Sequence, residues 1–454
     1  MAAHEVVGKS FTFLRNPKHM VSSLVEIGAR QVVTRFFAAY ISIGSLTIME
    51  DDGTIFTFEG TNNFSPKITL KVHHPRFYWK IMMQADLGLA NAYINGDFSF
   101  VDKDDGLLNF ILVLIANRDK NSSVATLKKK RGWWSPPLFT ASIAYAKYFF
   151  RHLSRQNSLT QVRRNISQHY DLSNQLFSFF LDDTMTYSCA IFKMEDEDLK
   201  VAQMRKNFVL IEKARTNKNH QVLDIGCGWG SLAIEIVKQS GCHYTGITLS
   251  EEQLKYAENK VQDLGLQDHI KFLLCDYRQL PSNIKYDRII SCGMIEAVGH
   301  EFLEDFFGTC ESVLAENGLL VLQFVSIPDE RYDEYRLSSD FIKEYIFPGV
   351  CIPSLSRITT AMARASKLCV EHLENIGIHY YQTLRCWRKN FLNNKSKILE
   401  LGFDERFVRT WEYYFDYSAA GLKSRTLGDY QIVFSRPGNV ATFNNPYRRI
   451  PSAY

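Results

Sequence analysis

The run Val222–Gly230 constrains the fold of this chain more than any other stretch. It reads VLDIGCGWG, an apolar segment with one acid, Asp224, followed by glycines at alternate positions. Glycine lets the backbone turn sharply and approach a ligand closely, because it has no Cβ atom. The seven residues that follow carry apolar side chains at helical spacing. The run therefore predicts a strand, a ligand-binding loop and the start of a helix.

The loop favours S-adenosylmethionine over a dinucleotide. A dinucleotide site of the GxGxxG type expects an acid about 20 residues further on, where it would bind the ribose. Here the next predicted strand, residues 243–247, ends instead in Thr248-Leu249-Ser250. Asp224 at the strand end, with a GxGxG loop, fits S-adenosylmethionine better. A glycine turn without a ligand remains the alternative, because such a motif alone is a weak signal.

Composition excludes several classes of protein. The 454 residues suffice for two or more domains, and a net charge of +4 is too small to indicate nucleic-acid binding. No apolar run approaches the roughly 18 residues that span a bilayer, and residues 1–10 lack the layout of a signal peptide. The nine cysteines, all from Cys189 onward, form no CxxC pair. We expect no disulfide framework, no metal site and a cytoplasmic location.

Residues 1–117 are predicted to form a small α+β domain. Apolar residues recur at helical spacing over 21–40, and short alternating strands follow at 45–49 and 54–59. A further helix is predicted from Pro75 to about Leu87. Nothing in this domain indicates catalysis, so we expect it to contact lipid or a second copy of the chain in a homodimer.

The segment 118–160 is predicted to be a linker followed by a helix. It contains the basic run Lys128–Arg131, followed at once by Trp133 and Trp134. Basic side chains are attracted to anionic bilayers by about 1 kcal/mol each, and tryptophan prefers the headgroup layer. The segment therefore suits peripheral binding to a membrane surface; a solvated linker with its tryptophans packed against a domain is the alternative.

From Val222 onward, strand-like and helix-like segments alternate. This alternation predicts an α/β fold with a doubly wound, mostly parallel sheet, whose sites lie at the carboxyl ends of the strands. Asp276 and Tyr277 follow one such strand and could bracket an adenine by hydrogen bonding and stacking; a helix cap and a core tyrosine are the alternative. The strands are expected at 222–225, 243–247, 270–274, 287–291 and 319–324.

Several longer motifs resemble the cyclopropane-fatty-acyl-phospholipid synthases and the related mycolic acid cyclopropane synthases, most of all the plant branch. The motifs are HYDLSNQLFSFFLDDTMTYSC from His169, VLDIGCGWG from Val222, GITLSEEQLKYA from Gly246, DRIISCGMIEAVGHEF from Asp287 and HYYQTLRCWRKNF from His379. The resemblance implies a class I S-adenosylmethionine-dependent methyltransferase domain over 161–454. Its implied reaction adds a methylene group to the cis double bond of an unsaturated phospholipid acyl chain at a membrane surface.

The resemblance also implies the site residues. Bicarbonate would act as the base, with Glu296 accepting its proton and Tyr380 donating a hydrogen bond. The remaining bicarbonate contacts would be Cys189, Gln323 and the backbone of Val325. The cofactor would be bound by Tyr187 and Ser188, by Asp224 and the loop glycines Gly226, Gly228 and Gly230, by Thr248 and Gln253 at the ribose, and by Asp276 and Tyr277 at the adenine.

Two departures from the family pattern leave other functions open. Gln323 stands where bacterial members have histidine, and Ser418 stands where other members have cysteine. Glutamine can donate to an anion but cannot carry a positive charge. A catalytically weak protein that binds lipid surfaces is therefore one alternative. An N-methyltransferase of a small amine is the other, because the resemblance extends to plant amine methyltransferases, which share the fold and the HYD region but lack the set of Cys189, Glu296 and Tyr380.

Overall fold

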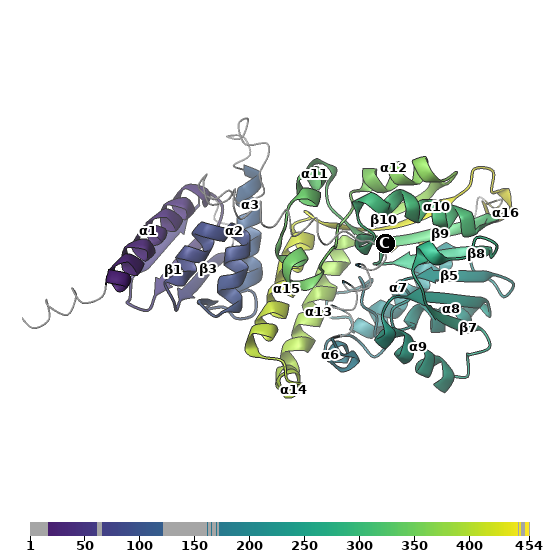
Figure 1. Cartoon of the computed structure of the whole chain (residues 1–454), viewed down its shortest axis with the longest axis horizontal. Coiled ribbons are helices and arrows are strands. Elements are labelled where there is room, and N and C mark those ends of the chain that lie inside the picture. The colour runs from purple at the N-terminus through teal and green to yellow at the C-terminus, as the bar shows by residue number, and fades with distance from the viewer. Residues whose placement is uncertain are drawn as a thin grey trace, which may run out of the picture. The chain divides into compact units, whose positions relative to one another are not determined.

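The computed structural model describes residues 17–60, 66–120, 161, 165, 169, 172–443, 445 and 450–453. The chain divides into two compact units, Met1–Ala146 and Lys147–Tyr454 (Figure 1). Helix α3, Gly106–Lys120, continues past the predicted domain end at residue 117. The basic run at 128–131 and its two tryptophans lie outside the described residues, so their predicted role at a membrane stays a prediction.

The first unit contains a four-stranded sheet in the order β2-β1-β3-β4. Strand β1 pairs antiparallel with β2 and parallel with β3, and β4 closes the sheet antiparallel to β3. Leu46, Ile48 and Leu70 are fully buried on one face of it. The strands are β1 Ser45–Glu50, β2 Ile55–Glu59, β3 Lys67–Val72 and β4 Phe98–Phe100, and the helices are α1 Pro17–Tyr40, α2 Arg76–Ile94 and α3.

Helix α2 is longer than the sequence predicted. It continues beyond Leu87 to Ile94, with a break at Ala85, whose φ of 53° is not helical. The apolar residues on either side of the break are buried, so both parts of α2 pack into the same core.

The second unit contains a seven-stranded sheet in the order β10-β11-β9-β8-β5-β6-β7. The five strands from β9 to β7 are parallel, and β11 lies antiparallel between β9 and β10. This confirms the predicted doubly wound, mostly parallel sheet. The strands are β5 Gln221–Ile225, β6 His243–Thr248, β7 Ile270–Leu274, β8 Tyr286–Cys292, β9 Leu314–Ser326, β10 Cys369–Asn375 and β11 Gly428–Ser435.

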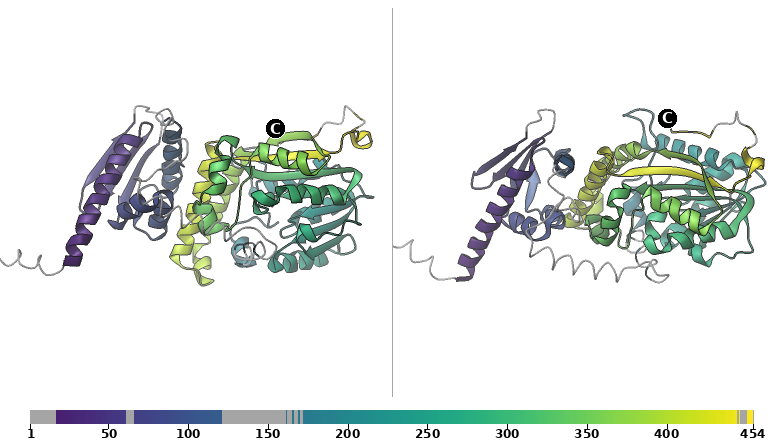
Figure 2. Two further views of the ribbon diagram at one scale, coloured as in Figure 1. Left: turned by 45° about the horizontal axis from the view of Figure 1, so that its top comes forward. Right: turned by 90° about the horizontal axis from the view of Figure 1, so that it is seen from above.

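Alternation along the central strands places apolar side chains on both faces of this sheet. On β9, Leu320 and Leu322 face the helices α10 and α12, whereas Leu319 and Val321 face α7 and α8. Figure 2 shows the two layers of helices around the sheet. The helices are α6 Asn174–Ser178, α7 Leu199–Ala214, α8 Ser231–Ser240, α9 Glu251–Asp263, α10 Leu303–Val313, α11 Asp329–Leu337, α12 Leu355–Ala365, α13 Gly377–Asn393, α14 Lys395–Glu400, α15 Glu405–Lys423 and α16 Val440–Phe443.

Helices α13 and α15 pack side by side and are joined by buried charges. The Asp416 carboxylate of α15 is fully buried and pairs with Arg385 at 2.5 Å and with Arg388 at 3.1 Å, both on α13. These pairs fix α13, which carries Tyr380, against the rest of the second unit. In the described part of the chain, no helix combines the length and apolar character needed to cross a membrane.

Candidate active site

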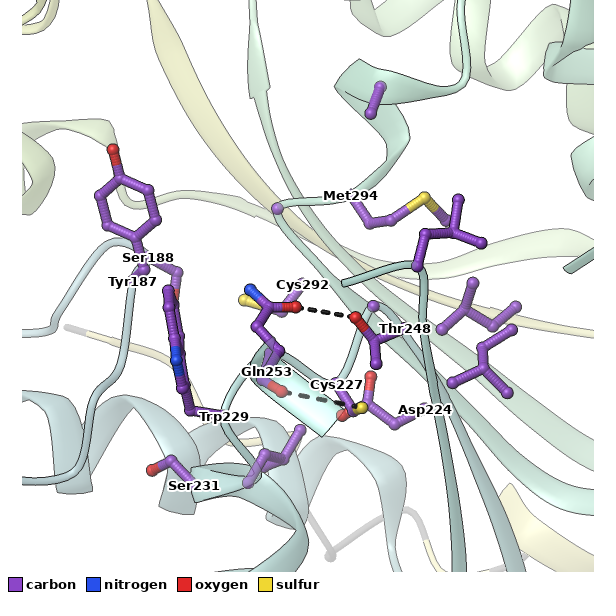
Figure 3. A pocket seen from close by; sticks show the side chains of 18 of the residues that line it. Tyr187, Ser188, Asp224, Cys227, Trp229, Ser231, Thr248, Gln253, Cys292 and Met294 are labelled. Carbon is purple, nitrogen blue, oxygen red and sulfur yellow. Dashed lines mark hydrogen bonds between the residues drawn. The ribbon is translucent and has the colours of Figure 1, made fainter. Parts of the chain in front are cut away.

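A pocket opens at the carboxyl ends of β5, β6, β7 and β8, where the alternation of strands and helices predicted a site. The loop between β5 and α8 lines one part of it, and the segment that carries Tyr187 and Ser188 lines another (Figure 3). Two side chains of α7, Lys206 and Asn207, also line the pocket. Of the ten residues predicted to bind the cofactor, nine line this pocket: Tyr187, Ser188, Asp224, Gly226, Gly228, Thr248, Gln253, Asp276 and Tyr277.

The glycine loop keeps the pocket open. Gly226 has a φ of +91°, and a Cβ atom there would lie 2.9 Å from the Met294 side chain. Gly230 does not line the pocket; it caps the start of α8, and a Cβ there would lie 3.1 Å from Ala257 and from Phe272. Gly230 thus seats α8 against its neighbours and leaves the contact with a ligand to the two earlier glycines.

Asp224 offers an unsatisfied acceptor to the pocket. Its side chain is 2% exposed, and the Tyr244 hydroxyl donates to its Oδ2 atom. Its Oδ1 atom has no hydrogen-bond partner among the described residues. Burial raises the pKa of this carboxyl to about 6, against the opposing effects of Tyr244 and Lys206. A buried acceptor of this kind favours a ligand that brings a donor or a positive charge.

Thr248 and Gln253 form a hydrogen-bonded pair inside the pocket. The Thr248 hydroxyl donates to Gln253 Oε1 at 2.8 Å, as Figure 3 shows. Ser250 caps α9 by accepting from the Gln253 backbone N–H at 3.1 Å, which fixes the start of the helix. Since the Gln253 amide oxygen is held by Thr248, its NH₂ group is left to donate to a ligand.

Asp276 and Tyr277 line the end of the pocket at β7. Arg278 binds the Asp276 carboxylate with Nε and Nη2, each at 2.8 Å, so the carboxylate is held in a paired arrangement. The Tyr277 ring packs edge-on against Phe306, and its buried hydroxyl has no partner among the described residues. Their predicted contacts with adenine stay predictions.

Sequence reasoning missed Lys206, a buried cation on α7. Its side chain is buried, and Nζ donates to the Ser188 hydroxyl at 2.9 Å. It forms no ion pair with any residue in the described ranges. Its position four residues after the buried Ala202 and three before the buried Val209 is a signal that could have placed it on the inner face. Lys206 therefore gives the pocket a positive charge close to Ser188.

Tyr187 is held by a chain of hydrogen bonds. Burial lowers the pKa of His169 to about 3, so its ring is neutral. Its Nδ1 atom lies 3.1 Å from the Ile346 carbonyl and must donate to it, which leaves Nε2 to accept from the Tyr187 hydroxyl at 3.3 Å. The Tyr414 hydroxyl lies 3.2 Å from that of Tyr187. This chain fixes the Tyr187 ring at the pocket wall.

An aromatic cluster packs behind this wall. Phe177 and Phe180 are fully buried, and their ring centroids lie 5.4 and 5.8 Å from that of Tyr187. The surroundings of Tyr187 are therefore apolar and dry, which suits a hydrocarbon chain.

The five residues predicted as catalytic gather in a second group, next to the pocket. Cys189 and Glu296 are buried, each flanked in the sequence by residues that line the pocket, and Gln323 pairs across the sheet with the pocket residue Cys292. Tyr380 packs against Cys189. The Val325 N–H donates to Glu296 Oε1 at 2.6 Å. We name this group, together with Asp429, the carboxyl cluster.

Asp429 is a member of this cluster that sequence reasoning missed. It lies on β11 opposite Val325, is 1% exposed, and accepts a hydrogen bond from Gln323 Nε2 at 3.1 Å. Burial raises the pKa of the Cys189 thiol, and the nearby charge of Asp429 raises it further. Burial also raises the pKa of Tyr380, with Tyr414 and Asp429 adding to the effect. The cluster therefore holds two buried carboxyls where the sequence predicted one.

The cluster as it stands has few free donors for a bicarbonate ion. The Val325 N–H is bonded to Glu296, and the Gln323 amide is bonded to Asp429. The thiol of Cys189 donates to the Ala190 carbonyl at 3.2 Å. Two of the contacts predicted for bicarbonate are thus made to carboxyl groups of the chain itself.

The fold and the pocket together define a class I S-adenosylmethionine-dependent methyltransferase. Residues 157–432 match the family described as mycolic acid cyclopropane synthetase. The chain belongs to this family, as its motifs indicated.

Relatives and a solved structure agree with this membership. The chain is 33% identical over 402 residues to the tuberculostearic acid methyltransferase UfaA1 of Mycobacterium tuberculosis, covering 87% of this chain and 88% of the relative. It is 32% identical to the cyclopropane-fatty-acyl-phospholipid synthase of Escherichia coli, covering 82% and 89%. The structure of the mycolic acid cyclopropane synthase CmaA1 complexed with SAH and CTAB is 28% identical, with a TM-score of 0.55, covering 60% of this chain and 98% of that one. The chain is an S-adenosylmethionine-dependent methyltransferase that acts on lipids; the plant-like detail stays a prediction.

Proposed function

We propose that this chain is a cyclopropane-fatty-acyl-phospholipid synthase. It would transfer a one-carbon unit from S-adenosylmethionine to the cis double bond of an unsaturated phospholipid acyl chain. The observation that carries the proposal is the carboxyl cluster, which places proton-accepting groups beside the cofactor pocket. Methylation of an amine forms no carbocation and removes no C–H proton, so it does not require buried proton acceptors of this kind. Two relatives that match over more than four fifths of both chains, each named for lipid chemistry, also support it.

The polar groups of the pocket suit the ends of S-adenosylmethionine. The Lys206 ammonium would bind the methionine carboxylate together with Ser188, and the open Oδ1 of Asp224 would accept from the methionine amino group. The NH₂ group of Gln253, whose oxygen is held by Thr248, would donate to the ribose. These contacts would hold the two polar ends of the cofactor, whose sulfonium supplies the methyl group that is transferred.

The chemistry requires a dry, well-ordered site. An alkene is a weak nucleophile, so holding it in line with the methyl group can contribute several kcal/mol, on the order of 7 or more. Methyl transfer leaves a carbocation, which water would capture. Aromatic faces stabilise such a cation by roughly 0.5–2 kcal/mol each. The buried rings of Phe177 and Phe180 pack behind Tyr187 and help to exclude water, and the Tyr187 ring, which lines the pocket, would supply such a face.

The carboxyl cluster offers few free hydrogen-bond donors to a bicarbonate base. Its predicted donors Val325 and Gln323 are bonded to carboxylates of the chain. We therefore assign proton removal to the carboxyl cluster and include no bicarbonate step.

Methylation without ring closure is the second candidate function. The observation that favours it is the 33% identity to a tuberculostearic acid methyltransferase over most of both chains. The two reactions share the cofactor pocket and differ in the fate of the carbocation.

Lipid analysis of cells that express the chain tests the proposal. We expect monounsaturated phospholipid acyl chains to gain the mass of one CH₂ group and to resist mild catalytic hydrogenation, because a cyclopropane has no double bond. A methylated product that takes up hydrogen would favour the second candidate. Unchanged lipids in cells that contain folded, cofactor-binding protein would contradict both. Flotation of the purified protein with anionic vesicles checks the proposed peripheral association with a membrane, and sedimentation checks the predicted homodimer.

A further inference from the structure

Asp429 is held in place by its backbone as well as by its side chain. Its N–H donates to Asn375 Oδ1 at 3.3 Å, and its carbonyl accepts from the Ile376 N–H at 2.7 Å. Gly377 lies so close that a Cβ there would be 2.8 Å from the Asp429 nitrogen. The side chain therefore projects into the carboxyl cluster from a fixed point on β11.

The hydrogen bonds around Asp429 form an ordered set. Gln431 Nε2 donates to Gln323 Oε1 at 2.9 Å, which fixes the orientation of the Gln323 amide. The Gln323 NH₂ group must then face Asp429, to which it donates at 3.1 Å. The thiol of Cys189 donates to the Ala190 carbonyl at 3.2 Å. Asp429 thus accepts from Gln323, one of the side chains that were predicted to hold a bicarbonate ion.

Glu296 completes the arrangement from the other side. Its Oε1 accepts from the Val325 N–H, and its Oε2 is buried without a partner among the described residues. The two carboxyls interact strongly enough that Glu296 raises the pKa of Asp429. Because the charge of each carboxyl disfavours ionisation of the other, the two carboxyls titrate as a coupled pair.

We propose that the carboxylate of Asp429 is the proton acceptor in ring closure and takes the place of a bicarbonate ion. This inference rests on the proposed function. It follows from the Gln323 donor that Asp429 shares with the predicted anion site, from its burial, and from its place on β11 opposite Val325, whose N–H binds Glu296.

The step balances without any further reagent. The alkene π electrons bond to the methyl carbon as its bond to sulfur breaks, and the neighbouring alkene carbon becomes a cation. Asp429 takes one proton from the new methyl group. The electron pair of that C–H bond then closes the third side of the ring. Glu296, with its open Oε2, is the next acceptor for the proton that Asp429 has taken.

The first test needs no variant. The purified chain is supplied with S-adenosylmethionine and vesicles of a monounsaturated phospholipid, in buffer stripped of carbon dioxide or supplemented with bicarbonate. We expect equal rates of ring formation in both, within about twofold. A rate that falls by about tenfold or more without bicarbonate and returns on its addition would overturn the proposal.

Variants provide the second test. Asp429→Asn should lower ring formation at least about 100-fold, the lower range for loss of a general base, with unchanged binding of S-adenosylhomocysteine. Asp429→Ala should lose activity similarly but regain part of it with bicarbonate or formate, because a small anion can enter the space left by the side chain. Asp287→Asn is the matched control: Asp287 is on β8 and binds the Gln221 N–H outside the cluster. It should keep the wild-type rate.

Asp429→Asn with wild-type turnover would overturn the proposal. Failure of the proposed function is distinguishable from this outcome, because the wild-type chain would then form no ring in either buffer.

Discussion

The cofactor pocket and the carboxyl cluster are neighbours on one sheet, but they differ in how their polar atoms are satisfied. In the pocket, Asp224 Oδ1 and the Tyr277 hydroxyl are buried without a partner among the described residues. In the cluster, the Val325 N–H and the Gln323 amide are bonded to carboxylates of the chain, and Glu296 Oε2 is left open. The pocket therefore has buried polar atoms left to bind a ligand, whereas most polar atoms of the carboxyl cluster are already hydrogen-bonded within the chain.

We therefore assign cofactor binding to the pocket and proton removal to the carboxyl cluster. Changes in the pocket should weaken cofactor binding, whereas changes in the cluster should affect ring closure and leave cofactor binding intact. The following variants are chosen to break that separation if it is false.

The largest effect is expected from Glu296→Gln. Glutamine can still accept from the Val325 N–H but cannot take a proton, so ring formation should fall at least about 100-fold. Binding of S-adenosylhomocysteine, measured by calorimetry, should stay within about twofold of wild type. Glu304→Gln on α10, at a surface carboxylate that pairs with Arg357, is the control and should be silent. Normal turnover in Glu296→Gln would remove Glu296 from the proton path.

Lys206→Met should have the next largest effect, and on binding. It removes a buried ammonium proposed to bind the methionine carboxylate, and a hydrogen bond to a charged group contributes about 1.5–3 kcal/mol, or roughly 10- to 100-fold in affinity. Calorimetry with S-adenosylhomocysteine measures it. Lys200→Met is the control, since Lys200 lies on the same helix, is exposed and pairs with Asp183. Equal affinities for the two variants would contradict the role of Lys206.

The pH dependence should follow the cluster and not the pocket. Burial raises the pKa of Glu296 to about 7, and burial with the charge of Glu296 raises that of Asp429 to about 7. Ring formation should therefore rise several-fold between about pH 6 and pH 8 as the carboxyls ionise. Cys189, Cys292 and Tyr380 face the same cluster, but burial raises the pKa of each, so they stay neutral in this range. Lys206 adds a positive charge that favours ionisation of Asp429.

The stability of the folded chain should fall as pH rises, whereas the rate of ring formation should increase. The unfolded carboxyls have pKa values of roughly 4, so the folded state binds these two protons more tightly. Their contribution to stability is complete below about pH 4 and is lost as pH rises through about 7. The Tm of the wild-type chain should fall over this range more than that of the Glu296→Gln, Asp429→Asn double variant. Parallel Tm profiles would show that the two carboxyls are not buried as described.

The smallest effect is expected from Thr248→Val. The variant removes the donor that orients Gln253, so affinity for S-adenosylhomocysteine should fall roughly two- to tenfold, the range for one neutral hydrogen bond. The fraction of methylated product that closes to a ring should not change. A changed fraction would mean that the pocket also controls ring closure.

The parts of the site that lie close together in sequence could be predicted, and the parts assembled from distant segments only partly. The glycine loop with Asp224 carries a local pattern whose geometry is set by three glycines, and it predicted a pocket that the structure confirms. Asp429 has no such pattern. It enters the site because β11 inserts antiparallel between β9 and β10, a pairing that the order of elements along the chain does not specify.

Lys206 illustrates a second limit. Lysine is rarely buried, and Lys200 on the same helix is exposed, so residue type alone argued against burial. Its helical spacing from Ala202 and Val209 was the only available signal. The predicted catalytic residues came from the resemblance to a family, and the contacts of Glu296 with Val325 and of Gln323 with Asp429 could not be inferred from it.

The most direct test of the account uses S-adenosylmethionine with a trideuterated methyl group. The purified chain is incubated with this cofactor and a monounsaturated phospholipid, and the acyl product is analysed by mass spectrometry. Because ring closure removes one hydrogen from the transferred methyl group, we predict a product that retains two deuterium atoms. A product that retains all three would show methylation without ring closure, and would contradict both the proposed synthase and the assignment of Asp429 as its base.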